Sequence, residues 1–308
     1  MSATDEFIYW LNGEFLPASQ AFIPVNNRGY RMGDGVFDTE RTFNGKLFRL
    51  EEHLERLERS LKYIRLDPGM SMAELGRLAE EAAERNAHLL ERHGDFWVTQ
   101  TLSREPGGGA FVSIIVEPLP FARYAPYYDT GIPLVIPNAR SSANIGMDPK
   151  LKATSRLNMV LADLEGKAVD PNSLSVLLDE HGNLAEVLYG NMFLVRDGKI
   201  RTPGSRAILE GVSRMTTLEL IAAEGLSLSE TDLQPYDLYT ADEAFVTTTS
   251  YCILPVASLN GQAVGVGEPG PLTRQMTAAW NARVGLDISA QMKAYGIDKQ
   301  ETPLTIAT

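Results

Sequence analysis

Three groups of residues in this chain have types and spacings that suit chemistry. Lys152 is one of eight lysines in 308 residues, and it precedes an apolar stretch with helical spacing. An amine desolvated beside such a stretch can react with an aldehyde. Taken alone, the same position also fits a surface lysine at the start of a helix.

The second and third groups are hydroxyl-rich. Gly211-Val212-Ser213 precede a predicted helix, whose unpaired N–H groups and dipole attract an anion. The run 247–250 (TTTS) offers further hydroxyls. Ser213 equally fits a helix cap, and the threonines fit an ordinary strand. An aldehyde cofactor with a ring nitrogen and a phosphate needs a lysine for the aldehyde, a carboxylate for the ring nitrogen and hydrogen-bond donors for the phosphate. Lys152 and the two hydroxyl-bearing groups meet the first and the last of these needs.

Other catalytic patterns are absent from the sequence. There is no GxSxG elbow, and the glycines at 107–109 lack the Lys-Ser/Thr of a phosphate-binding loop. The single cysteine, Cys252, excludes an internal disulfide and fits a core position. Four histidines show no metal-ligand spacing, so no metal site is predicted. His53 is expected on the polar side of a helix.

Composition narrows the class of protein. The chain has 28 basic and 40 acidic residues, a formal charge of −12, and 44% hydrophobic residues. This balance disfavours nucleic-acid binding because no basic patch offsets it. No apolar run approaches the ~20 residues of a membrane span, and the N-terminus is acidic. We expect a cytoplasmic protein without nucleic-acid or membrane partners.

Hydrophobic spacing predicts an α+β first half. Strands are expected at 7–11, 36–39, 96–102 and 111–116, with helices from Leu50 and over 71–90. The proline-bearing segment 118–126 is the predicted linker. In the second half, strands are expected at 133–137, 173–178, 191–195 and 244–256, the last interrupted at 247–250, with helices at 154–169, after Ser213 and at 271–283. The expected domains are 1–120 and 133–292, joined by 121–132 and followed by a polar tail, 293–308.

Six blocks in a fixed order resemble the class IV (fold type IV) pyridoxal-phosphate aminotransferases. This group includes branched-chain and D-amino-acid aminotransferases, (R)-selective amine transaminases and aminodeoxychorismate lyases. The resemblance covers about residues 7–290. The blocks are RGYRMGDGVFDT (28–39), FRLEEHLERL (48–57), KATSRLNMVLA (152–162), LAEVLYGNMFLVRDGKIRTP (184–203), ILEGVSR (208–214) and FVTTTSYCILPV (245–256).

The resemblance implies a two-domain α+β fold with pyridoxal 5′-phosphate in the interdomain cleft, and a homodimer. It places the cofactor lysine at Lys152 rather than Lys150, and the acid facing the ring nitrogen at Glu186. Leu209 would lie against the ring. The phosphate would be bound by Arg56, Val212, Ser213, Thr248 and Thr249.

Substrate recognition departs from the family patterns. Where small residues usually follow the acid, this chain has Val-Leu-Tyr189-Gly, and strand 96–100 (FWVTQ) lacks the arginine of branched-chain enzymes. Arg104, placed in a glycine-rich loop, is expected to swing in for a carboxylate and out for a bulky apolar group. The expected substrate-binding residues are Phe37, Val98, Arg104, Tyr189 and Ser250.

The predicted activity is therefore transfer of an amino group from a D-amino acid or (R)-primary amine to a 2-oxo acid. The alternatives are a branched-chain L-amino-acid aminotransferase, an aminodeoxychorismate-type lyase, and a protein that binds the cofactor without catalysis.

Overall fold

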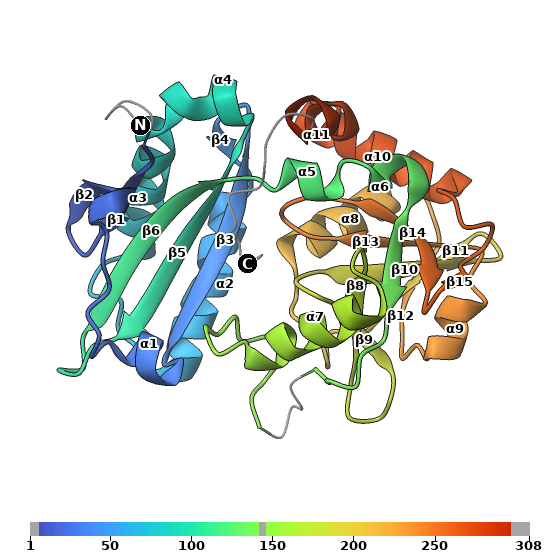
Figure 1. The fold of residues 1–308 in the computed structure, drawn as a ribbon, viewed down its shortest axis with the longest axis horizontal. Coiled ribbons are helices and arrows are strands. Elements are labelled where there is room, and N and C mark those ends of the chain that lie inside the picture. Colours follow the sequence, from blue (N-terminus) through green and yellow to red (C-terminus); the bar gives the residue numbers. More distant parts are fainter. Residues whose placement is uncertain (1–5, 142–145, 297–308) are drawn as a thin grey trace. The chain divides into compact units, whose positions relative to one another are not determined.

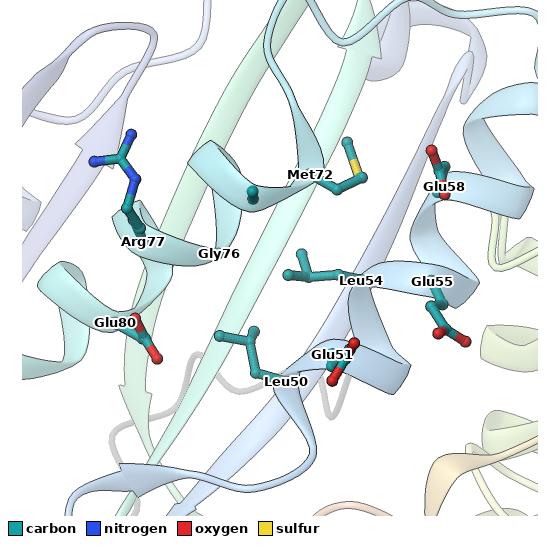
Figure 2. A pocket seen from close by; sticks show the side chains of 10 residues that line it. Leu50, Glu51, Leu54, Glu55, Glu58, Met72, Gly76, Arg77 and Glu80 are labelled. Carbon is teal, nitrogen blue, oxygen red and sulfur yellow. The ribbon is translucent and has the colours of Figure 1, made fainter.

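The computed structural model describes residues 6–141 and 146–296. The chain divides into two compact units, each with its own sheet (Figure 1). Met1–Leu119 and Leu151–Ser155 form the first unit, and Pro120–Lys150 and Arg156–Thr308 form the second. The expected mixed α+β class is confirmed. Part of the predicted tail, 297–308, lies outside the described residues.

The first unit is built on an antiparallel sheet of six strands in the order β2-β1-β6-β5-β3-β4. Long neighbouring strands pair in register, with Asp38 opposite Gln100 and Thr39 opposite Thr99. The strands are β1 (Ile8–Leu11), β2 (Glu14–Pro17), β3 (Gly35–Phe43), β4 (Lys46–Leu47), β5 (Phe96–Arg104) and β6 (Ala110–Pro118).

Helices α2 (Leu50–Ile64) and α3 (Met72–Arg85) pack against the sheet of the first unit (Figure 1). Leucines on α2 recur at steps of three and four and enter one core with strand residues of β3, β5 and β6. Ser71 caps α3 by accepting the N–H of Glu74 at 3.1 Å. The smaller helices here are α1 (Arg28–Met32) and α4 (Leu90–His93), with 3₁₀ turns η1 (Ala18–Gln20) and η2 (Ala87–Leu89).

The second unit holds a mixed sheet in the order β12-β11-β10-β13-β14-β7-β8-β9, with β15 beside β14. Its strands are β7 (Ile132–Val135), β8 (Leu174–Leu178), β9 (Leu184–Val187), β10 (Asn191–Arg196), β11 (Lys199–Thr202), β12 (Leu228–Glu230), β13 (Glu243–Thr247), β14 (Leu254–Leu259) and β15 (Gln262–Ala263). Its helices are α5 (Phe121–Tyr124), α6 (Tyr127–Thr130), α7 (Leu157–Val169), α8 (Val212–Ala223), α9 (Pro235–Tyr239), α10 (Pro271–Val284) and α11 (Ile288–Gly296). None of the helices described here is long and apolar enough to cross a membrane.

The segment predicted as a linker is folded. Prolines 120 and 126 stand at the N-caps of α5 and α6, where a missing N–H costs little. Phe121, Tyr124 and Tyr128 are buried. The segment therefore forms part of the second unit rather than an extended connection.

The structure sharpens or changes three other elements. The stretch 244–256, predicted as a strand interrupted at 247–250, is two separate strands, β13 and β14, and the chain turns between them with Cys252 at φ 61°. The helix predicted at 71–90 ends at Arg85, since the side chain of the buried Asn86 bonds the backbone of Ile8 at 2.8 Å. Helix α11 extends to Gly296, so the start of the predicted tail is helical.

The helix expected from Thr154 begins at Leu157 because the preceding residues pair with β3. The N–H of Phe37 donates to the carbonyl of Lys152, and the N–H of Thr154 donates to the carbonyl of Gly35, both at 3.0 Å. Residues 151–155 thus extend along β3, and they fix the backbone of Lys152 within the first unit.

Candidate active site

The first unit places a buried carboxylate between two basic side chains. Asp38 on β3 is fully buried, and its Oδ1 accepts hydrogen bonds from Arg56 Nη2 at 2.6 Å and His53 Nδ1 at 2.8 Å. Its Oδ2 accepts a bond from Arg56 Nε at 2.8 Å. His53 and Arg56 are three residues apart on α2, so one helix face presents both to β3. The paired arrangement matches the bidentate geometry that arginine forms with carboxylates.

His53 is not on the polar side of its helix, contrary to the sequence expectation. Only 3% of the residue is exposed, and the imidazole faces Asp38. The spacing along α2 could not reveal this burial, because the acid that pairs with His53 lies fifteen residues earlier, on a strand. Burial lowers the pKa of His53, and the bond to Asp38 opposes this effect. Burial alone would raise the pKa of Asp38, but Arg56 and His53 outweigh it and hold that pKa well below its usual range.

Lys152 and Lys150 occupy different settings. The Lys152 amine lies over the ring of Phe37, with Nζ 4.4 Å from the ring centroid, and its backbone is bonded to β3. Lys150 is exposed, with its amine 3.9 Å from the Asp148 carboxylate. Lys152 is therefore the lysine with an aromatic neighbour and a fixed backbone, both of which suit a reacting amine.

The second unit holds Glu186 on β9, where the residue is 4% exposed. Its Oε2 accepts the backbone N–H of Leu209 at 3.2 Å. The carbonyl of Leu209 accepts a bond from the amide of Asn191 at 3.0 Å. Leu209 is thus fixed at both ends of its peptide backbone, beside the acid. Asn191 was not singled out from the sequence, although it lies within the block of Glu186, five residues after that acid.

The residues around Tyr189, where the sequence departs from the family pattern, form a tight turn between β9 and β10. Tyr189 has φ 65°, and Val187 and Gly190 bond each other's backbone at 3.1 and 2.9 Å. A Cβ at Gly190 would lie 2.5 Å from the carbonyl of Thr247, so the close approach of β13 requires glycine there. The turn directs Tyr189 toward another residue that the sequence did not indicate, Arg156.

Arg156 stacks on Tyr189, with its guanidinium carbon 4.6 Å from the ring centroid. Burial lowers the pKa of Arg156, while Tyr189 and the negative charge of Glu186 oppose that shift. Burial likewise raises the pKa of Tyr189. Tyr189, Arg156 and Glu186 therefore belong to one polar cluster of the second unit. The only sequence signal for Arg156 was its place four residues after Lys152.

Two groups in the second unit suit an anion. Helix α8 begins after Gly211, an N-cap residue that makes no side-chain cap bond, and the first N–H groups of such a helix start, at Val212 and Ser213, suit an anion. Thr249 is half-buried and Ser250 buried in the turn after β13. The hydroxyl of Thr248 donates to the carbonyl of Tyr189 at 2.8 Å. Its hydroxyl hydrogen thus holds the turn.

Two expected substrate residues take other roles. Val98 packs with Leu57 and Val36 in the core of the first unit, because successive strand residues face opposite sides and Val98 is on the helix-covered side. It is a core residue and not a pocket residue. Phe37 lies on the other side, beside Lys152.

Arg104 is the last residue of β5 rather than part of the glycine loop. Its guanidinium Nη2 donates to the carbonyl of Ile64 at 2.7 Å, and Nε lies 3.3 Å from Asp34 Oδ2. A further bond reaches the carbonyl of Arg65 at 3.3 Å. These bonds hold Arg104 at the end of α2, and the expected swinging motion has no support in its contacts.

The donor set suits pyridoxal phosphate. The first unit offers a lysine amine and a buried arginine, and the second offers a buried carboxylate and a helix start after glycine; these residue types match the needs of the cofactor's aldehyde, ring nitrogen and phosphate. No group of three or more His, Cys, Asp or Glu side chains that could hold a metal occurs in residues 6–141 and 146–296.

Comparison with known proteins identifies the family. Residues 35–259 match the model of class IV amino-transferases. A D-alanine aminotransferase of Bacillus licheniformis is 30% identical over 274 residues, 87% of this chain and 94% of that protein. The branched-chain-amino-acid aminotransferase-like protein 2 of Arabidopsis thaliana is 28% identical over 284 residues, 89% of this chain and 50% of that protein.

The fold has solved counterparts. The T.th. branched-chain amino acid aminotransferase, solved with pyridoxamine 5′-phosphate, superimposes with a TM-score of 0.83 at 24% identity, covering 94% of this chain and 96% of that one. A family match over most of the chain and a shared two-sheet fold agree with the donor set described above. The chain therefore belongs to the class IV aminotransferases, pyridoxal-phosphate-dependent enzymes that pass amino groups from amino donors to 2-oxo acids.

Proposed function

We propose that this aminotransferase takes its amino group from a D-amino acid or an (R)-configured primary amine and gives it to a 2-oxo acid such as pyruvate. The observation that carries the proposal is the absence of arginine in β5 before Arg104, which is itself held by Asp34 and the end of α2. A strand β5 that aims no guanidinium into the site favours the (R)-primary amines, whose recognition does not depend on a carboxylate. The resemblance to D-alanine aminotransferases also supports it.

The roles proposed for this chain's residues follow from their settings. When bound, pyridoxal phosphate supplies a reactive aldehyde and a ring that withdraws electrons from the substrate carbon. Lys152 would carry the cofactor and then move a proton between the substrate carbon and the cofactor's aldehyde carbon. Glu186, buried and fixed beside Leu209, would keep the ring nitrogen protonated.

The phosphate would be bound by Arg56 and by the start of α8. Val212 and Ser213 would offer backbone N–H groups, and Thr249 a hydroxyl. Thr248 would support this group indirectly, because its hydroxyl donates to the backbone of Tyr189. Ser250 and Tyr189 would border the substrate.

The test is a half-reaction with single donors. The purified holoenzyme is mixed with D-alanine, (R)-1-phenylethylamine, L-leucine or L-valine, and the loss of the cofactor's long-wavelength absorbance is followed. We expect rapid bleaching with the first two and at least tenfold slower bleaching with the L-amino acids. Rapid reaction with L-leucine or L-valine alone would instead assign a branched-chain enzyme. Release of pyruvate from aminodeoxychorismate without amino transfer would assign a lyase.

We also propose that two copies of the chain associate through α7. Leu157, Val160, Leu161 and Leu164 follow one side of this helix at helical spacing, and they are 69%, 37%, 48% and 61% exposed. A second copy would cover this stripe, since large apolar side chains in a row mark interaction surfaces. Sedimentation should give a dimer, and Leu161→Glu should shift it toward monomer. A monomeric unmodified protein would contradict the association.

A further inference from the structure

Asp38 and Arg56 form a buried ion pair in the first unit. The carboxylate of Asp38 accepts bonds from Arg56 Nε, Arg56 Nη2 and His53 Nδ1, and from the backbone N–H of Thr39 at 2.8 Å. Asp38 is 0% exposed, and Arg56 is 6% exposed. An arginine this deeply buried needs a counter-ion, because an unpaired buried charge is costly.

Three other titratable groups lie near this pair: Glu40, His53 and Lys152. Glu40 lies on the same side of β3, and burial raises its pKa well above the usual value, which favours its uncharged form. Burial, Arg56 and Lys152 all lower the pKa of His53, which favours its neutral form. Asp38 therefore supplies the negative charge that faces Arg56 in the protein without cofactor.

An anion that binds Arg56 must share the guanidinium with Asp38. Two of the five N–H donors of Arg56 already bond Asp38. A phosphate carries more negative charge than the carboxylate, and like charges within a few ångströms of each other repel strongly at a buried site. Asp38 thus balances Arg56 in the empty protein and weakens the binding of the phosphate that Arg56 is proposed to hold.

We propose that Asp38 is a built-in counter-ion that keeps the buried Arg56 stable before the cofactor binds, at the expense of affinity for the cofactor's phosphate. This inference rests on the proposed phosphate-binding role of Arg56. Asp38 is a positioning residue, since it acts on the phosphate through Arg56. Its removal should separate two properties that a purely structural residue would change together: stability without ligand should fall, and phosphate affinity should rise.

The experiment compares two ligands that differ only in the phosphate. Pyridoxamine 5′-phosphate and pyridoxamine are titrated into apoprotein, and binding is followed by tryptophan fluorescence. Neither ligand has the aldehyde that reacts with lysine, so the ratio of their dissociation constants isolates the phosphate contribution. In Asp38→Asn we expect this ratio to shift by about tenfold or more toward the phosphorylated ligand. The thermal midpoint of the unliganded variant should fall.

Glu40→Gln is the matched control. It changes a buried acid on the same side of the same strand, but one whose charged form burial disfavours, so the ratio should stay within about twofold of the unmodified protein. An unchanged or smaller preference for the phosphorylated ligand in Asp38→Asn would overturn the counter-ion role. If the unmodified protein bound both ligands equally, the proposed phosphate role of Arg56 would fail instead.

A second measurement uses the unmodified protein, in case Asp38→Asn does not fold. The chain has four histidines, so nuclear magnetic resonance can follow the titration of His53 against three internal controls. His53 faces Asp38 from β3, Arg56 on its own helix, and Lys152. Phosphate charge at Arg56 should raise the pKa of His53 with pyridoxamine 5′-phosphate and not with pyridoxamine. Equal pKa values with both ligands would contradict the shared carboxylate.

Discussion

Replacing Arg56 by alanine should destabilise the protein without cofactor by an amount that follows from the buried bonds it deletes. The change deletes both bonds to Asp38, at 2.6 and 2.8 Å, and leaves a fully buried carboxylate with only His53 and a backbone N–H. Breaking a buried ion pair from one side costs about 3–5 kcal/mol. The same change should also weaken cofactor retention, through lost phosphate contact.

The assay is urea unfolding of the apoprotein, with Arg59→Ala as the control. Arg59 lies one turn further along the same helix, its side chain is 65% exposed, and its guanidinium Nη1 is 3.7 Å from Glu55 Oε2. Removing it should cost about 0.5 kcal/mol or less. Arg56→Ala combined with Asp38→Asn should recover part of the loss, because the unpaired charge is gone.

The stability lost in Arg56→Ala should grow as the pH rises. Arg56 and His53 outweigh the effect of burial and hold the folded-state pKa of Asp38 below its usual value, so the pair's stabilisation is present above the unfolded pKa of about 3.9 and fades as pH falls. In Arg56→Ala, burial dominates and raises the pKa of Asp38. The stability gap between the two proteins should therefore widen from pH 4 to pH 7. A constant gap, or a cost no larger than that of Arg59→Ala, would refute the role of a buried charge pair.

Three further predictions concern single residues. Lys152→Ala should abolish transamination and the cofactor's absorption band, whereas Lys150→Ala should keep both; borohydride reduction and peptide mapping that found the cofactor on Lys150 would reverse the assignment. Glu186→Gln should retain the cofactor, seen by absorbance, but slow the donor half-reaction by at least tenfold, because a neutral ring withdraws electrons poorly; full activity would argue against a contact with the ring nitrogen. Burial raises the folded-state pKa of Glu40, so above an unfolded pKa of about 4.3 the unmodified protein should lose stability relative to Glu40→Gln by up to about 1.4 kcal/mol per pH unit, and parallel stability curves in urea would contradict this.

Local patterns in the sequence were sufficient for most elements. The leucine spacing after Leu50 predicted α2, and the apolar spacing over 71–90 predicted α3, which begins at Met72. The six blocks also placed the chain in its family, and the family match agrees. These features succeed because spacing, caps and turns act between residues close in the chain.

Contacts between distant segments decided the rest. Prolines at 120 and 126 suggested a linker, but aromatic side chains beside them are buried, and the segment folds into short helices. Val98 was expected to line the substrate site, but the pairing of β5 with β3 turns it toward the core. The sequence alone does not show which side of a sheet a strand residue faces, because alternate residues point to opposite sides and the pairing with the neighbouring strand sets which side is buried.

The sequence by itself determined which residue types were present for pyridoxal-phosphate chemistry: one lysine in a recognisable block, an acid in another, and hydroxyls near a helix start. Only the tertiary structure showed that His53 is buried, that Arg56 shares the carboxylate of Asp38, and that Arg156 stacks on Tyr189. The physical reason is that charge and protonation depend on burial and on partners brought together from separate elements. The spacing of residues along a helix predicts only which of its faces is apolar, whereas the ionisation of His53 depends on Asp38, on a strand fifteen residues earlier.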